Sequence, residues 1–146
     1  MKLDLTFEVG EEHEALLREH VPRAAELLKH APDALSVAVV GDAEMAQLHE
    51  QFLNLPGPTD VLTFELDHDQ TGRVTEGEIV VCLPEAQRQA ATRSHDAGVE
   101  LLLYVIHGLL HLVGYDDHDP ADYAAMHAKE DQILQSLGFG TIFGEN

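Results

Sequence analysis

Cysteine is almost absent from this chain, which has one, Cys82, among its 146 residues. A single thiol cannot form an internal disulfide, so the fold must rely on a buried core, which a chain of this length can form. Cys82 lies in the apolar, strand-like run 79–83, where a cysteine acts as a small hydrophobic residue. We therefore expect a protein of a reducing compartment.

Long apolar runs are also missing, although hydrophobic residues make up 45% of the chain, a value typical of globular proteins. No segment approaches the roughly 20 apolar residues that a membrane-spanning helix needs. No charged-then-apolar signal segment opens the chain. We expect a cytoplasmic protein that has no membrane partner.

Basic residues are few, because 8 lysines and arginines face 27 aspartates and glutamates, for a formal net charge of −19 with neutral histidine. A field of this sign repels polyanions at long range and argues against a general nucleic-acid binder. The basic residues are scattered, so the sequence shows no basic stripe. An RNA substrate would have to be held locally, by a metal and by a few arginines such as Arg73, Arg88 or Arg93.

The chain length fits one domain over residues 1–146. Alternating or apolar runs predict strands over 3–9, 35–40, 60–66 and 78–83, with a polar hairpin loop over 67–76. Helical spacing predicts helices over 11–30, 42–52, 84–95, 97–113 and 120–136, and Pro22 is expected to kink or interrupt the first. This order predicts an α+β fold in which a four-stranded mixed sheet, one strand antiparallel, packs against about five helices.

The predicted helix over 97–113 is apolar almost all round, so we expect it to be the buried central helix. His107 and His111 project from the same face of this helix, with Cβ atoms about 5–6 Å apart. Two ring nitrogens can then reach one metal ion at about 2.0–2.1 Å. Gly114 ends the helix, and the chain turns back to offer a third imidazole, His118. Three nitrogens and one open position indicate a catalytic, zincin-like zinc site, although nickel or cobalt would also accept three imidazoles.

Position 108 separates this chain from zinc proteases of the HExxH type, which carry a glutamate after the first histidine as the general base. Gly108 has no carboxylate, so ordinary protease chemistry is not expected. A small residue here lets another strand or a substrate approach the helix closely. Surface or capping roles are expected for His13, His20, His30, His68, His95 and His127, and the role of His49 stays open.

Three motifs resemble signatures of the YbeY family, the bacterial endoribonucleases and ribosomal-RNA maturation factors. The run HGLLHLVGYD at 107–116 is similar to the family's histidine motif. The run PTDVLTF at 58–64 resembles its TDVLSF strand, and GEIVV at 77–81 resembles its G-D/E-I strand. The three motifs occur in family order, and the resemblance covers nearly the whole chain.

The resemblance implies a single-strand-specific endoribonuclease that uses one Zn²⁺ ion. It implies action in 16S ribosomal RNA 3′-end maturation and in ribosome quality control. By motif, His107 and His111 match the first two metal ligands. The family usually reads Gly-Tyr-Asp-His where this chain has an additional aspartate, so strict counting places Asp117 at the third ligand position. His118 is the better donor to zinc and is the expected ligand, with Asp117 as the alternative.

The expected mechanism is hydrolysis of a phosphodiester by a zinc-activated water, whose pKa the metal lowers towards about 7. Asp116 or Asp117 would orient a ligand imidazole or accept a proton, as would Glu78 if its strand runs beside the site. The expected partners are single-stranded or ribosomal RNA, together with small-subunit ribosomal proteins or assembly factors attracted to the acidic surface. The oligomeric state stays open.

Leu53 stands where the YbeY family commonly carries an arginine implicated in RNA handling. A missing guanidinium removes a bidentate phosphate contact that leucine cannot replace. Two alternatives therefore stay open beside the endoribonuclease. One is a ribosome-biogenesis binding factor that retains zinc but cleaves weakly, and the other is a metal-dependent hydrolase of another substrate.

Overall fold

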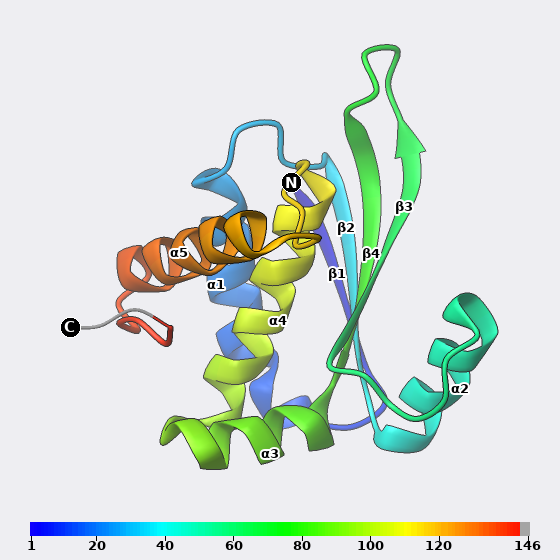
Figure 1. The fold of residues 1–146 in the computed structure, drawn as a ribbon, viewed down its shortest axis with the longest axis vertical. Helices are drawn as coiled ribbons and strands as arrows, with labels where there is room; N and C mark the ends of the chain where they lie inside the picture. The colour runs from blue at the N-terminus through cyan, green and yellow to red at the C-terminus, as the bar shows by residue number, and fades with distance from the viewer. Residues whose placement is uncertain (144–146) are drawn as a thin grey trace.

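Four strands form one mixed sheet in the computed structural model, which describes residues 1–143 (Figure 1). β1 (Lys2–Phe7), β2 (Ala34–Val40) and β4 (Val74–Cys82) run parallel to one another. β3 (Val61–His68) pairs with β4 in the antiparallel sense and forms one edge of the sheet, whose order is β1-β2-β4-β3. The predicted α+β fold with one antiparallel strand is confirmed.

Helices cover both faces of this sheet. Over the described residues they are the 3₁₀ helix η1 (Glu11–His13) and α1 (Glu14–Glu26), α2 (Asp42–Leu53), α3 (Leu83–Arg93), α4 (Ala97–Leu112) and α5 (Pro120–Ser136). Figure 1 shows α1, α4 and α5 on one side of the sheet and α2 on the other. α4 contacts α1, α3, α5 and the sheet, so it is the central helix that its composition predicts. Within residues 1–143, no helix has the length and apolar character needed to cross a membrane.

The alternation of side chains along the strands divides the buried residues into two clusters. Val37, Val39 and Ile79 point towards α4 and belong to the main core. Val40 and Val80 point to the opposite face and pack in a smaller cluster with Met45 of α2, among other residues. The larger cluster therefore anchors α4, the helix that carries the two candidate metal ligands.

α4 lies so close to β4 that glycine occupies two of the contact positions. A Cβ atom on Gly108 would lie 2.7 Å from Ile79 Cδ1, and one on Gly77 would lie 2.6 Å from Leu112 Cδ1. Carbon atoms normally pack at about 3.5–4.0 Å. The small residue at position 108 therefore admits a neighbouring strand, and this contact fixes how closely α4 approaches the sheet.

The structure differs from the predicted boundaries in two main places. α1 ends at Glu26, earlier than predicted, and it continues through Pro22. The helix tolerates this proline because Val21 and Ala24 are fully buried in the core, and their packing outweighs the cost of a proline inside a helix. β3 and β4 extend into the segment predicted as a loop and leave a short turn in which Asp69 accepts hydrogen bonds from Thr71 and Arg73. Polar residues pair as strands there because the arms of the hairpin are largely solvated.

Candidate metal centre

His107 and His111 meet on one face of α4, as their spacing predicts. Their Nε2 atoms lie 3.0 Å apart, and the ring planes are nearly perpendicular, at 83°. Two nitrogens bound to one tetrahedral zinc ion would be about 3.3 Å apart, given bond lengths of about 2.0–2.1 Å. The two imidazoles are therefore already spaced to share an ion.

The hydrogen bonds made by the opposite ring nitrogens determine which atoms of the two imidazoles are free. The backbone carbonyl of Tyr115 lies 3.2 Å from Nδ1 of His111 and can only accept, so Nδ1 carries the proton. The carboxylate of Glu130 lies 3.1 Å from Nδ1 of His107 and accepts in the same way. Both Nε2 atoms then present lone pairs to each other. Such an arrangement is favourable when a cation, either a proton or a metal ion, lies between them, and it therefore fits a metal site.

Asp117 completes a set of three donors. Its Oδ2 lies 3.9 Å from Nε2 of His107 and 3.8 Å from Nε2 of His111. The three ligand atoms all lie within 4.8 Å of one another. Gly114, with φ of 105°, ends α4 in a conformation that favours glycine and turns the chain back towards the histidines. Two imidazoles and one carboxylate resemble the His₂Glu ligand set of some catalytic zinc sites.

His118, the expected third ligand, lies elsewhere on the same turn. Its side chain is 85% exposed, and its Nε2 lies 3.3 Å from Oδ2 of Asp116. Asp116 also accepts a 2.7 Å hydrogen bond from the backbone N–H of Asp117, which tightens the turn. The structure brings Asp117 to His107 and His111, and it groups His118 with Asp116 and Asp117 in a second, fully exposed set.

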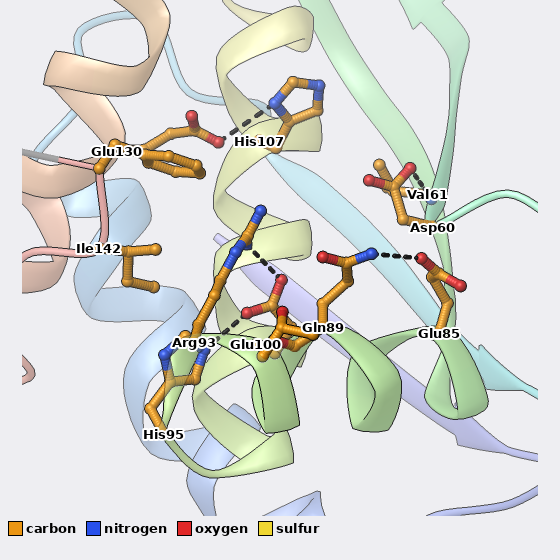
Figure 2. A network of polar contacts seen from close by, with 12 residues as sticks. Asp60, Val61, Glu85, Gln89, Arg93, His95, Glu100, His107, Glu130 and Ile142 are labelled. Carbon is orange, nitrogen blue, oxygen red and sulfur yellow. Dashed lines mark hydrogen bonds and ion pairs between the residues drawn. The ribbon is translucent and has the colours of Figure 1, made fainter.

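Glu130 of α5 supports His107 from behind. Its side chain is 2% exposed, and its second oxygen lies 2.5 Å from Nδ1 of His127. Figure 2 shows Glu130 and His107 facing each other across the space between α5 and α4. Burial alone would lower the pKa of His107, but the hydrogen bond and charge of Glu130, with the charges of Asp60 and Asp117, raise the pKa above its usual value. The surroundings of His107 therefore favour a cation.

Glu130→Gln is expected to weaken zinc binding by about tenfold, because a neutral amide no longer fixes the proton on Nδ1 of His107. Isothermal titration of the metal-free protein with Zn²⁺ measures the change. Gln132→Glu, an exposed change on the same helix with the opposite sign of charge, serves as the control and should leave the affinity nearly unchanged. Equal affinities for the wild-type protein and Glu130→Gln would show that Glu130 has no supporting role.

A groove of about 610 Å³ runs along β3 to the two histidines. It is lined by Leu53, His107 and His111, with several residues of β3 between them, and its lining contains no lysine or arginine. Leu53, at the end of α2, is 54% exposed. The position where the family arginine is expected therefore faces the candidate substrate groove, and in this chain it presents an apolar side chain.

The arginines named from the sequence are all paired with acidic residues. Arg88 of α3 makes two hydrogen bonds of 2.9 Å to Asp42 of α2. Arg73 pairs with Asp33 and Asp69, and it shares a hollow with His111. Arg93 makes a 2.7 Å hydrogen bond with Glu100 and lines a cavity that also contains His107.

Sequence reasoning missed two residues near the metal centre and included one that lies away from it. Glu130 was not connected with the histidines, because it is 23 residues from His107 along the chain. His127, expected at the surface, is instead partly buried and stacks on Phe143. Glu78 lines an apolar hollow on the face of the sheet opposite α4, so it does not lie beside the histidines. The helical spacing of Met126, Glu130, Ile133 and Leu134 was the available signal that Glu130 faces inward.

Comparisons with known proteins agree with this architecture. The sequence model of the family described as Endoribonuclease YbeY matches residues 4–138. Endoribonuclease YbeY of Leifsonia xyli subsp. xyli is 39% identical over 134 residues, which cover 86% of each chain. Endoribonuclease YbeY of Mycolicibacterium smegmatis is 38% identical over 115 residues, which cover 73% of this chain and 65% of the relative. That of Mycobacterium ulcerans is 40% identical over 110 residues, which cover 69% of this chain and 62% of the relative.

The chain thus spans less than two thirds of the length of these two mycobacterial relatives. Among solved structures, the solution structure of TM1509 from Thermotoga maritima superposes with a TM-score of 0.62 and 25% sequence identity, over 99% of each chain. The family match extends over most of the sequence and includes both histidines of α4. The chain therefore belongs to the Endoribonuclease YbeY family.

Proposed function

We propose that this chain, acting as one domain over residues 1–146, is a metal-dependent endoribonuclease that cleaves single-stranded RNA. The observation that carries the proposal is the pair of Nε2 atoms 3.0 Å apart on α4, each left as an acceptor by the hydrogen bond on the opposite side of its ring. Family membership supports the choice of RNA as the substrate, because the relatives are named endoribonucleases.

We assign His107, His111 and Asp117 as the ligands of one metal ion, with His118 as the alternative third ligand. Zinc is the metal that this donor set favours among those common in hydrolases. A bound zinc ion would supply Lewis acidity at this position, which lowers the pKa of a water towards about 7 and stabilises charge on a phosphoryl oxygen. With three protein ligands, one position stays open for solvent or substrate.

The remaining residues of the site would orient these donors. Glu130 keeps the proton of His107 on Nδ1, and the carbonyl of Tyr115 does the same for His111. Asp116 accepts from the backbone N–H of Asp117 and so holds the turn that presents the third ligand. The groove along β3 gives a single strand of RNA a path to the histidines. In this assignment Asp116 acts through the position of Asp117 rather than as a proton acceptor.

We infer that the physiological substrate is ribosomal RNA, with roles in 16S ribosomal RNA 3′-end maturation and ribosome quality control in the cytoplasm. The net charge of −19 supports partners of opposite charge, such as basic small-subunit ribosomal proteins or assembly factors. These partners would also bring the RNA to a protein that repels it at long range.

A second candidate is a ribosome-biogenesis binding factor that retains zinc but cleaves weakly. Leu53 and the absence of lysine and arginine from the lining of the groove favour it, because a phosphate in the groove meets no guanidinium. A hydrolase of another substrate is the third candidate, and Gly108 counts against its peptidase version.

The test of the proposed function is cleavage of a defined RNA that contains one single-stranded and one duplex segment. The purified, zinc-loaded protein is expected to cut only the single-stranded segment, because a groove of about 610 Å³ is too small for a duplex to enter. Gel analysis of end-labelled RNA locates the cuts. Binding without any cut would favour the binding factor, and equal cutting of both segments would contradict the assignment of the groove to a single strand.

A further inference from the structure

A second cavity opens on the other side of His107. It has a volume of about 310 Å³ and is bounded by α3, α4, α5 and the beginning of β3. His107 and Asp117 are both in its wall, so it adjoins the candidate metal centre. Figure 2 shows Asp60, Gln89 and Arg93 converging on this space from the start of β3 and from α3. A substrate bound at the metal centre would therefore have this cavity beside it.

Two buried polar atoms of residues that line the cavity make no hydrogen bond among the described residues. They are Oη of Tyr104, whose residue is 4% exposed, and Nε2 of His127. Burial and the nearby carboxylate of Glu100 raise the pKa of Tyr104, so its hydroxyl keeps its proton and can donate. A buried polar atom without a partner costs about 1–3 kcal/mol. Two such atoms in one cavity next to the metal centre indicate that a polar ligand completes it.

The charge of the cavity shows which part of an RNA strand can enter it. Asp60 and Glu85 line it together with Asp117, and Arg93 is already bound to Glu100. A phosphate would meet more negative than positive charge there, whereas a neutral nucleobase would not. His127 and Phe143 stack on each other, and Arg93 lies over the Phe143 ring, so the aromatic surface left for a base is that of Tyr123, which is 53% exposed.

Asp60 determines which bases suit the cavity. Its Oδ1 accepts the backbone N–H of Val61 at 2.8 Å, which fixes the carboxylate, while its Oδ2 makes no hydrogen bond within residues 1–143. A free carboxylate oxygen accepts from an exocyclic amino group, such as N4 of cytosine. Uracil lacks this group. The hydroxyl of Tyr104 can donate to a ring nitrogen or carbonyl oxygen of the same base.

We propose that this cavity binds the nucleobase next to the cleaved phosphodiester and selects bases that carry an exocyclic amino group. The assignment rests on the proposed function, because it requires RNA at the metal centre. The phosphate lies at the metal and the adjoining base turns into the cavity, where Asp60 accepts from its amino group and Tyr104 donates to it.

The experiment measures base preference in the zinc-loaded protein. Fluorescence anisotropy with 2′-O-methyl pentanucleotides of cytosine, adenine and uracil gives the affinities, and cleavage of the matching RNA oligomers gives kcat/KM. The cytosine and adenine oligomers are expected to bind about tenfold more tightly than the uracil oligomer. Asp60→Asn should remove this preference, because its amide can donate as well as accept. Asp4→Asn, which makes the same change of charge on β1, should preserve it.

Tyr104→Phe provides an independent measurement. If Oη binds the base, the variant binds all three oligomers several-fold more weakly, although removal of an unpaired buried hydroxyl leaves its thermal stability equal or higher. If Oη is only an unpaired atom of the core, the affinities do not change, and the assignment is overturned.

The outcomes distinguish a failure of the base-binding cavity from a failure of the proposed endoribonuclease function. A protein that binds and cuts RNA without base preference, and whose Asp60→Asn variant behaves like the wild type, has the proposed function but no base pocket. A protein that neither binds nor cuts any of the oligomers has neither.

Discussion

Alanine in place of His111 is expected to give a protein that binds zinc several hundred-fold more weakly and does not cut RNA. Four-ligand zinc sites provide about 10–16 kcal/mol, so one ligand corresponds to about 2.5–4 kcal/mol. At about 1.4 kcal/mol per factor of ten, this loss gives the expected change in affinity. Zinc content by elemental analysis and cleavage of single-stranded RNA are measured on the same preparation. Unchanged cleavage by a metal-free variant would end the metal-dependent mechanism.

Two further variants identify the third ligand. Asp117→Ala is expected to lose zinc as His111→Ala does, because Oδ2 of Asp117 lies within 3.9 Å of both Nε2 atoms. His118→Ala is the matched control from the same turn, and it should retain zinc, because its imidazole is 85% exposed and pairs with Asp116. The reverse result would establish His118 as the ligand, with the turn rearranged around the ion.

Leu53→Arg is expected to raise kcat/KM for single-stranded RNA by about 30-fold. The position lies in the groove that leads to His107 and His111, and a guanidinium there can make charge-assisted hydrogen bonds to a phosphate. Such bonds contribute about 1.5–3 kcal/mol, which corresponds to roughly 10-fold to 150-fold. Steady-state cleavage by the wild-type and variant proteins, at equal zinc content and ionic strength, measures the gain.

Leu55→Arg is the control for this gain. Leu55 is exposed like Leu53 and lies two residues along the chain, but it does not line the groove. The two variants have the same net charge, so a long-range electrostatic effect would appear in both. A gain confined to Leu53→Arg would indicate a local phosphate contact. Equal gains would indicate that the overall acidity of the protein, rather than position 53, limits cleavage.

Much of the fold follows from local patterns in the sequence. The apolar run of α4 predicts a central helix, and the helix predicted over 120–136 has the bounds of α5. The ends of α1 and the length of the hairpin were predicted less well. The course of α1 depends on the burial of Val21 and Ala24 against distant parts of the chain. The length of the hairpin depends on the pairing of two solvated strands. A short window of sequence shows neither of these interactions.

Part of the candidate site could likewise be predicted from local patterns, and part could not. The spacing of His107 and His111 predicts their meeting, because the helix repeats every 3.6 residues. The third position depends on a turn that contains a hydrogen bond from the Asp117 N–H to Asp116 and that brings Asp117, rather than His118, to the two histidines. Histidine is the better zinc donor, but donor strength does not determine where a side chain points. Glu130 and His127 reach the centre only because α5 packs across α4, and the sequence shows no such long-range contact.

The absence of Cβ atoms at positions 77 and 108 has a consequence for metal uptake. Because the helix and the strand touch at these points, any sideways shift of α4 would drive Ile79 or Leu112 into backbone atoms. The two imidazoles are thus immobilised before an ion arrives, and only the carboxylate of Asp117, on a solvent-exposed turn, has to be ordered when the ion binds. The entropy lost when the metal binds is then confined to one short segment. Substitutions in residues 114–119 should therefore change the rates of metal binding and release more than substitutions in α4 do.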